Sequence, residues 1–180
     1  MLKLLQEIFK TGNATVKYPF APLKVVKDAR GKPEHDVQQC IACSACATAC
    51  PANAIQMHID SKAGTITWEF NCGRCIFCGR CEEVCPTEAI KLGPEFELAV
   101  MSKDDLREEC VYLLQACESC GKYYAPRKEI DYARKILALQ KGNDQIDAAL
   151  DRVAMCPDCR RLHDAVAAQR SVDVQGGNHA

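Results

Sequence analysis

The sequence predicts an α+β fold in which a duplicated cysteine-rich core precedes a mainly helical C-terminal segment. Two observations define the core: CIACSACATACPANAI at 40–55 recurs as CIFCGRCEEVCPTEAI at 75–90, and two apolar stretches lie between the copies. The third is that apolar residues beyond position 100 recur at helical spacing. We therefore expect an N-terminal amphipathic helix and extended docking arm at 1–30, the duplicated domain at 31–100, a helical segment with its own cysteine site at 101–165, and a flexible tail at 166–180.

Composition indicates that the cysteines bind metal rather than form disulfides. The 180 residues include fourteen cysteines. The start, MLKLLQEIFK, lacks the apolar core and cleavage site of a signal peptide, and no apolar run approaches the roughly 18 residues of a membrane span. We therefore expect a cytoplasmic protein, in which regular C-x-x-C spacings are metal ligands. Because only 6% of the residues are aromatic, bound metal is expected to supply much of the stability.

The repeated motif has the ligand spacing of a two-cluster bacterial ferredoxin-like core. C-x-x-C-x-x-C wraps a loop round one [4Fe–4S] cube, so that three thiolates and several backbone N–H groups converge on it. The fourth cysteine, which precedes a proline, reaches the other cube. The predicted ligands of the first cluster are Cys40, Cys43, Cys46 and Cys85, and those of the second cluster are Cys75, Cys78, Cys81 and Cys50.

Two tetrahedral zinc sites are the alternative explanation of the repeat. Zinc sites usually pair two C-x-x-C knuckles, whereas each copy here has three consecutive steps and a Cys-Pro, which favours clusters. A further cysteine, Cys72, offers a shifted register, but Ile76 and Pro86 align with the first copy only when Cys75 is the first ligand. We therefore interpret Cys72 as a small buried residue near the second cluster, and Cys110 in the same way.

Strands are expected between the two copies of the motif. AIQMHI at 54–59 and GTITWEF at 64–70 flank the turn-rich stretch DSKAG and predict a β-hairpin. Trp68 lies in the second of these strands, and we interpret it as a packing residue rather than an electron relay.

Helices are expected beyond residue 100. Ser102 and Asp105 resemble a helix N-cap, so the sequence predicts a helix over 103–116. Another helix is expected from about Pro126 to a stop at Gly142, and a third after a cap at Asp144.

Four late cysteines form two widely separated knuckles that suit one tetrahedral ion. They are Cys117 and Cys120 in CESCGKYY, and Cys156 and Cys159 in CPDC. We expect a rubredoxin- or zinc-ribbon-like site of four cysteines that holds Zn²⁺ or a single iron. A third cube is the alternative, which the intervening pair of predicted helices disfavours. The acidic residues near these cysteines argue against a zinc ribbon that binds nucleic acid.

Charge and missing motifs limit the functions that fit. The formal net charge is −1, and the charge of the metal-loaded protein falls to roughly −7 when clusters, thiolates and a divalent ion are included. This disfavours nucleic acid and anionic membranes as main partners. The sequence has no G-x-G-x-x-G and no P-loop. No catalytic residue is predicted, and we expect an electron carrier rather than an enzyme.

The first ten residues predict an amphipathic helix. Leu2, Leu4, Leu5, Ile8 and Phe9 form an apolar stripe opposite charged and polar side chains. Such a helix suits a membrane surface or a partner subunit, and the alternative is a helix that packs on its own domain.

The surroundings of the two motifs also differ in charge. Arg74 precedes the second motif and Arg80 lies within it, whereas the residues of the first motif near its cysteines are small and neutral. Positive charge stabilises the more negative, reduced form of a cluster. The sequence therefore predicts that the second cluster is the easier one to reduce.

Over nearly its whole length the chain resembles the small ferredoxin-type subunit of formate hydrogenlyase and related hydrogenase-4 complexes. The resemblance rests on ATVKYPFAPL at 14–23, RGKPE at 30–34, WEFNCGRCIFCGRCEEVCPTEAI at 68–90 and the late four-cysteine site. The cluster core is also similar to the two-cluster subunit of respiratory complex I, which lacks the late four-cysteine segment. At Cys72 the family is expected to have an aliphatic residue.

The resemblance implies a subunit that passes electrons within a membrane-anchored complex, at the inner face of the cell membrane. It implies hydrogenase small and large subunits, another iron–sulfur subunit and membrane subunits as partners, with electrons flowing towards a nickel–iron site. The alternatives are a complex I-type, quinone-linked electron-transfer subunit, a free soluble ferredoxin, and a redox-sensing or zinc-ribbon interaction module. Metal content and co-purifying subunits distinguish them.

Overall fold

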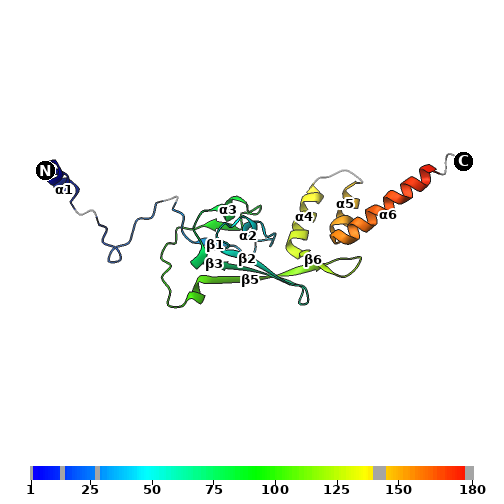
Figure 1. Cartoon of the computed structure of the whole chain (residues 1–180), viewed down its shortest axis with the longest axis horizontal. Helices are drawn as coiled ribbons and strands as arrows, with labels where there is room; N and C mark the ends of the chain where they lie inside the picture. The colour runs from blue at the N-terminus through cyan, green and yellow to red at the C-terminus, as the bar shows by residue number, and fades with distance from the viewer. Residues whose placement is uncertain (1, 13–14, 27–28, 140–144, 177–180) are drawn as a thin grey trace.

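The computed structural model describes residues 2–12, 15–26, 29–139 and 145–176. Two antiparallel sheets form its centre (Figure 1). The smaller pairs β1 (Pro33–His35) with β4 (Ile90–Leu92), and the larger has the strand order β2 (Ile55–Asp60), β3 (Thr65–Asn71), β5 (Arg107–Ala116), β6 (Tyr123–Pro126). Short helices α2 (Ala45–Ala49) and α3 (Arg80–Glu83) lie within the two cysteine motifs, and a 3₁₀ turn, η1 (Cys72–Arg74), precedes the second motif.

The hairpin expected between the motifs is confirmed as β2 and β3, which pair from Ile55–Phe70 to Asp60–Thr65. The alternation along β3 buries Ile66, Trp68 and Phe70 on one face. These side chains form the centre of the hydrophobic core, against which the cysteine motifs pack.

The helix predicted over 103–116 is wrong. Ser102 does cap a helical turn, with the Asp105 carboxylate accepting from the Ser102 backbone N–H, but this turn is a short 3₁₀ helix, η2 (Lys103–Leu106). Strand β5 follows and pairs along β3, from Asn71–Arg107 to Thr65–Leu113. Its burial alternates, with Tyr112 buried and Val111 and Leu113 exposed. Burial along β5 alternates with a period of two, and β3 offers an unpaired edge. Together these outweigh the local N-cap signal, which favours a helix.

Because β5 pairs with β3, the large sheet continues across the boundary expected at residue 100. It joins the duplicated core to the C-terminal helices α4 (Arg127–Leu139), α5 (Gln145–Val153) and α6 (Pro157–Gly176). Lys128 at the start of α4 fixes this junction, because its ammonium donates to the backbone oxygens of Val37 (2.7 Å) and Gln38 (3.2 Å), just before the first motif.

The two late helices are confirmed as α4 and α5, but the predicted stop at Gly142 and cap at Asp144 lie outside the described residues. A flexible tail was expected at 166–180, but residues 166–176 of this stretch are helical, and 177–180 lie outside the described residues. Helix α6 continues through this stretch as far as Gly176. Its first turn begins at Pro157, a residue suited to that position because it lacks an N–H.

The predicted N-terminal helix is confirmed as α1 (Leu2–Thr11), which lies at one end of the molecule, well away from the sheets (Figure 1). Its apolar stripe is open to solvent: Leu4, Leu5, Ile8 and Phe9 are all exposed, Phe9 to 85%. The alternative of a helix packed on its own domain is therefore not what the structure shows. Within the described parts of the chain, no helix has both the length and the apolar character that a membrane crossing needs.

Gly31 is expected to be the least replaceable glycine of the core. A Cβ added there would overlap the carbonyl oxygen of Glu95 and lie 2.7 Å from that of Gly93. Both oxygens accept backbone hydrogen bonds that close the β1–β4 sheet, so neither yields easily. We expect Gly31→Ala to lower the melting temperature by several degrees, as overpacking of about 2 kcal/mol does in a chain of this size. Gly73→Ala is the matched control, since its Cβ would meet only side-chain atoms, at 3.2 and 3.4 Å. Equal effects of the two substitutions on thermal unfolding would contradict this assignment.

Candidate metal centres

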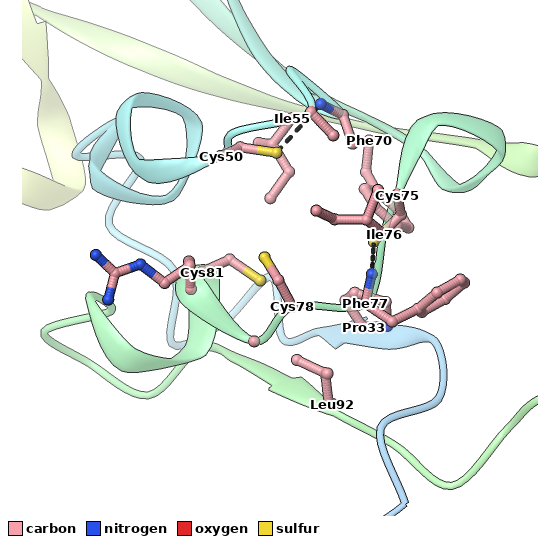
Figure 2. Close-up of a pocket in the computed structure, with 14 residues that line it drawn as sticks. Pro33, Cys50, Ile55, Phe70, Cys75, Ile76, Phe77, Cys78, Cys81 and Leu92 are labelled. Carbon is pink, nitrogen blue, oxygen red and sulfur yellow. Dashed lines mark hydrogen bonds between the residues drawn. The ribbon is translucent and has the colours of Figure 1, made fainter.

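Two similar cavities lie between the small sheet and the core, each lined by four of the predicted cluster ligands. The first cavity, of about 370 Å³, is lined by Cys40, Cys43, Cys46 and Cys85. The second cavity, of about 360 Å³, is lined by Cys50, Cys75, Cys78 and Cys81. Figure 2 shows the side chains of the second set surrounding one space. Each cavity therefore takes three cysteines from one copy of the motif and the fourth from the other copy.

The backbone of the two motifs repeats as closely as the sequence does. Three positions in each copy have a left-handed conformation, with positive φ: two residues after the first cysteine, one after the second and three after the fourth. The equivalent pairs are Ala42 (57°) and Phe77 (54°), Ser44 (65°) and Gly79 (80°), and Asn53 (50°) and Glu88 (53°). Only one of the six is glycine, and the conformation costs the others on the order of 1 kcal/mol each. The shared loop geometry therefore imposes these turns.

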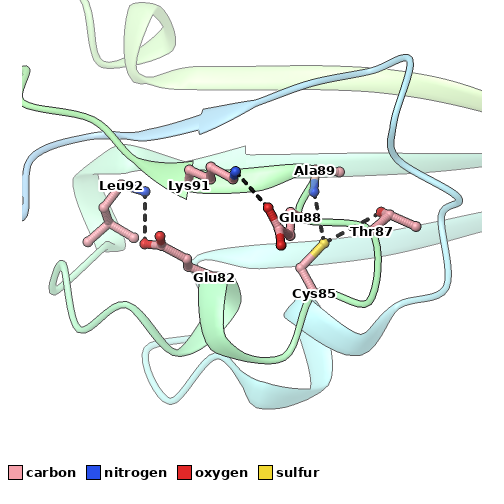
Figure 3. Close-up of polar contacts among 7 residues, drawn as sticks. All are labelled: Glu82, Cys85, Thr87, Glu88, Ala89, Lys91 and Leu92. Atoms are coloured by element: carbon pink, nitrogen blue, oxygen red, sulfur yellow. Dashed lines mark hydrogen bonds and ion pairs between the residues drawn. The ribbon is translucent and has the colours of Figure 1, made fainter.

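These turns direct backbone N–H groups at cysteine sulfurs. The N–H of Ala42 donates to the Cys40 sulfur (3.4 Å), and that of Phe77 donates to the Cys75 sulfur (3.3 Å). After each Cys-Pro, the N–H of an alanine donates to the preceding cysteine, at 3.2 Å in both copies; Figure 3 shows Ala89 with Cys85, beside the hydroxyl of Thr87. Such donors stabilise thiolate charge.

Burial opposes that charge. It raises the pKa of the Cys46 thiol to about 11, and it raises the pKa of the equivalent Cys81 thiol to about 11. A thiolate at either position is therefore unfavourable unless a bound cation compensates it. Soft thiolates, converging N–H groups and an apolar enclosure together fit an iron–sulfur cluster in each cavity.

One N–H group, unpaired within the described parts of the chain, indicates that the first cavity holds a hydrogen-bond acceptor. Trp68 is 1% exposed, and among the described residues its indole nitrogen has no hydrogen-bond partner. A buried N–H without a partner costs about 1–3 kcal/mol. An acceptor inside the cavity, such as a sulfur of a cluster, removes that cost.

The four late cysteines form a third, more compact group. The sulfurs of Cys117, Cys120, Cys156 and Cys159 all lie within 4.8 Å of one another. The Cys120 and Cys156 sulfurs are 3.8 Å apart, which is the edge of a tetrahedron with metal–sulfur bonds of about 2.3 Å. The Cys156 N–H donates to the Cys117 sulfur (3.1 Å), and this bond lowers the pKa of the Cys117 thiol to about 6. The group fits a single ion bound by four thiolates.

Two cysteines remain outside these groups. Cys72 is buried in the core at η1, as predicted. Cys110 packs against the core from β5, not from the predicted helix. Sequence reasoning missed the contributions of His35 and Tyr112 to the first cavity: His35 lines it and stacks on Trp68 at 3.9 Å, and the hydroxyl of Tyr112 lies 3.5 Å from the His35 ring. No local motif contains these residues. The only sign in the sequence that they face the core is the alternation of side chains along their strands.

Comparisons with known proteins show what this chain is similar to. Residues 39–89 match the family model of the 4Fe-4S dicluster domain. One similar solved structure is a chain from "Structure of the membrane-bound sulfane sulfur reductase (MBS), an archaeal respiratory membrane complex"; it is 30% identical, with a TM-score of 0.45, over 58% of this chain and 56% of that one. Formate hydrogenlyase subunit 6 of Escherichia coli (strain K12) is 45% identical over 170 residues, which cover 94% of each chain. The chain belongs to the family of formate hydrogenlyase subunit 6.

Proposed function

We propose that this protein relays electrons through two [4Fe–4S] clusters within a membrane-associated complex of the formate hydrogenlyase type, towards nickel–iron hydrogenase subunits. The observation that carries the proposal is the pair of matched cavities, each lined by the four cysteines that the motif spacing predicts. The 4Fe-4S dicluster match over residues 39–89 and the 45% identity to a formate hydrogenlyase subunit support it.

In this proposal Cys40, Cys43, Cys46 and Cys85 hold the first cluster, and Cys75, Cys78, Cys81 and Cys50 hold the second. When bound, each cluster supplies a site that accepts and releases one electron at a time. The protein's part is to fix the distance between the two sites, because each motif contributes a ligand to the other's cavity. The core side chains behind the motifs exclude water, which limits the rearrangement that a change of charge requires.

The proposed role is that of a carrier and not a catalyst. Each cavity is lined mainly by cysteines and by small or core side chains, and this enclosure suits a cluster. We infer that the reactions at each end of the electron path take place in partner subunits.

For the late cysteine group we propose a single Zn²⁺ or iron ion held by Cys117, Cys120, Cys156 and Cys159. Cysteine sulfurs within 4.8 Å of one another are too close together to bind the four separate irons of a cube, and they suit one tetrahedral ion. The ion joins the loop after β5 to the start of α6, so its proposed role is to hold the C-terminal helices on the core.

Metal analysis of the anaerobically purified full chain tests both assignments. We expect about eight iron and about eight acid-labile sulfide per chain, with one further zinc or iron. Zinc alone, without acid-labile sulfide, would contradict the electron-transfer proposal. About twelve iron per chain would contradict the single-ion site and indicate a third cube.

The partners that we propose are the hydrogenase small and large subunits, another iron–sulfur subunit and the membrane subunits of the complex, at the inner face of the cell membrane. The exposed stripe on α1 and the arm behind it are the proposed docking elements. Tyr18 in that arm donates a hydrogen bond to Glu97 and packs on Phe96 with ring centroids 6.0 Å apart, which ties the arm's middle to the core. The helix beyond it is left free to bind a neighbour.

Charged substitutions on this stripe test the docking proposal. Ile8→Asp with Phe9→Asp is expected to release the chain from the complex, because both side chains are exposed apolar residues with no packing role in the chain itself. The tagged chain should then co-purify with other subunits at least tenfold less, while its iron content stays unchanged. Gln6→Asp on the polar face is the control. Retention of the double variant in the complex would refute a docking role for α1.

A further inference from the structure

The two cavities are built from corresponding positions, yet they differ in side-chain hydrogen-bond donors. On each of β1 and β3, two residues that are two positions apart line different cavities. The residue two positions after the fourth cysteine also lines a different cavity in each motif. The pairs, first cavity before second, are His35 and Pro33, Trp68 and Phe70, and Thr87 and Ala52. In every pair only the side chain at the first cavity has an N–H or an O–H. The backbone donors of the two motifs, by contrast, match one for one.

Trp68 is the donor whose position is fixed most firmly. Its ring stacks on that of His35, with centroids 3.9 Å apart, and the Phe70 ring lies near it at a centroid distance of 6.1 Å. The indole nitrogen has no partner among the described residues, although the side chain is buried. Cys46, a proposed ligand of the first cluster, lines the same cavity as Trp68.

We propose that the indole N–H of Trp68 donates a hydrogen bond to sulfur of the first cluster, and that this bond makes the first cluster the easier of the two to reduce. The inference rests on the proposed function, because it requires both clusters. The physical reason is that reduction adds negative charge to the cluster sulfurs, so a donor fixed on them stabilises the reduced form more than the oxidised one. Phe70, at the corresponding place beside the second cavity, has no donor to offer.

This order is the reverse of the one predicted from the charges of Arg74 and Arg80. In the structure the Arg80 side chain lines the second cavity, but it is 62% exposed and pairs with Glu83 at 2.8 Å, so solvent and the carboxylate both weaken its field. Arg74 is exposed as well. The Lys128 ammonium lies 5.4 Å from the centre of the Tyr112 ring, and the hydroxyl of Tyr112 lies 3.5 Å from the ring of His35, which lines the first cavity. A buried donor in a low dielectric outweighs exposed, compensated charges.

Isotope labelling tests the hydrogen bond without any substitution. Trp68 is the single tryptophan of the chain, so growth with indole-¹⁵N tryptophan labels this one ring nitrogen. The loaded full chain is reduced in steps and examined by pulsed electron paramagnetic resonance at each step. We expect a ¹⁵N hyperfine coupling in the cluster signal that appears first. No ¹⁵N coupling in either cluster would overturn the hydrogen bond, and a coupling only in the signal that appears last would overturn the order of reduction.

Trp68→Phe tests the energetic effect. We expect the ratio of reduced to oxidised first cluster at a fixed potential to fall about tenfold, which for one electron corresponds to about 59 mV. The second cluster should not change. Ile66→Val is the control for a smaller core without the loss of a donor, because Ile66 is buried on β3 and lines neither cavity, and it should leave the first cluster unchanged. Equal shifts of both clusters in Trp68→Phe, or no shift of the first, would overturn the proposal.

Failure of the Trp68 proposal can be distinguished from failure of the proposed electron-transfer function. A wild-type chain with about eight iron and eight sulfide but no ¹⁵N coupling leaves the proposed electron-transfer function standing and removes only the role of Trp68. A chain without acid-labile sulfide removes the proposed function. Should Trp68→Phe fail to load clusters, the labelled wild-type protein still decides the question.

Discussion

Cys75→Ser is expected to remove about four of the eight iron atoms of the loaded chain, because a cube rarely persists when one of its four thiolates is lost. Cys75 lines the second cavity and accepts the N–H of Phe77 at 3.3 Å, so its sulfur takes part in the local loop geometry as well as in the ligand set. The first cluster should survive, because none of its proposed ligands changes. Iron and sulfide analysis, together with the cluster signals in electron paramagnetic resonance, measures the result.

Cys72→Ser is the matched control, three residues away. Cys72 is buried in the core, and it lines neither cavity. The substitution should therefore keep about eight iron per chain and cost only a modest amount of stability, since a hydroxyl replaces a buried thiol. Loss of iron from Cys72→Ser with retention in Cys75→Ser would show that the shifted register supplies the ligands and would falsify the assignment of the second cluster.

Cys156→Ser is expected to have the second large effect, the loss of the single ion and of the fixed arrangement of the C-terminal helices. Cys156 is buried, its sulfur lies 3.8 Å from that of Cys120, and its N–H bonds the Cys117 sulfur. Structural zinc binding is worth on the order of 10 kcal/mol in small zinc domains, so its loss exceeds what the remaining contacts of this segment offset. Limited proteolysis should then cut within 117–176, while the duplicated core keeps about eight iron per chain.

Cys110→Ser is the control for this prediction. Cys110 lies on β5 of the same segment and packs against the core, but it belongs to none of the three cysteine groups. The Cys110→Ser variant should keep the ion and resist the protease as the wild type does. A fall of about four iron per chain in Cys156→Ser would indicate a third cluster in place of a single ion. An unchanged metal content would show that these cysteines hold no ion.

Much of the fold was readable from local patterns, and the failures have a common cause. The hairpin at β2 and β3 and the helices α1, α4 and α5 were predicted because each carries its own periodicity or turn signal. Strand β5 was missed because a genuine capping box at Ser102 suggested a helix, although it serves only the turn η2. What makes 107–116 a strand is the free edge of β3, a partner more than thirty residues earlier in the chain.

The order of the two potentials shows the same limit at the candidate site. Arg74 precedes the second motif and Arg80 lies within it, and their charges were the visible difference between the copies. Whether a charge is exposed, or a neutral N–H is buried beside a sulfur, is decided by folding. Trp68 lies more than twenty residues from Cys46, and β3 brings the two together.

Local patterns were enough to predict which four cysteines line each cavity, because ligand spacing and the Cys-Pro that follows are properties of short stretches of chain. The family was predicted from longer matching stretches and is confirmed. What surrounds the cysteines was visible only in the folded chain: the stacked His35 and Trp68 beside the first cavity, Pro33 and Phe70 beside the second, and the sheet that joins core to helices. These side chains come from separate strands, and their distances to a sulfur are fixed only when the sheets form.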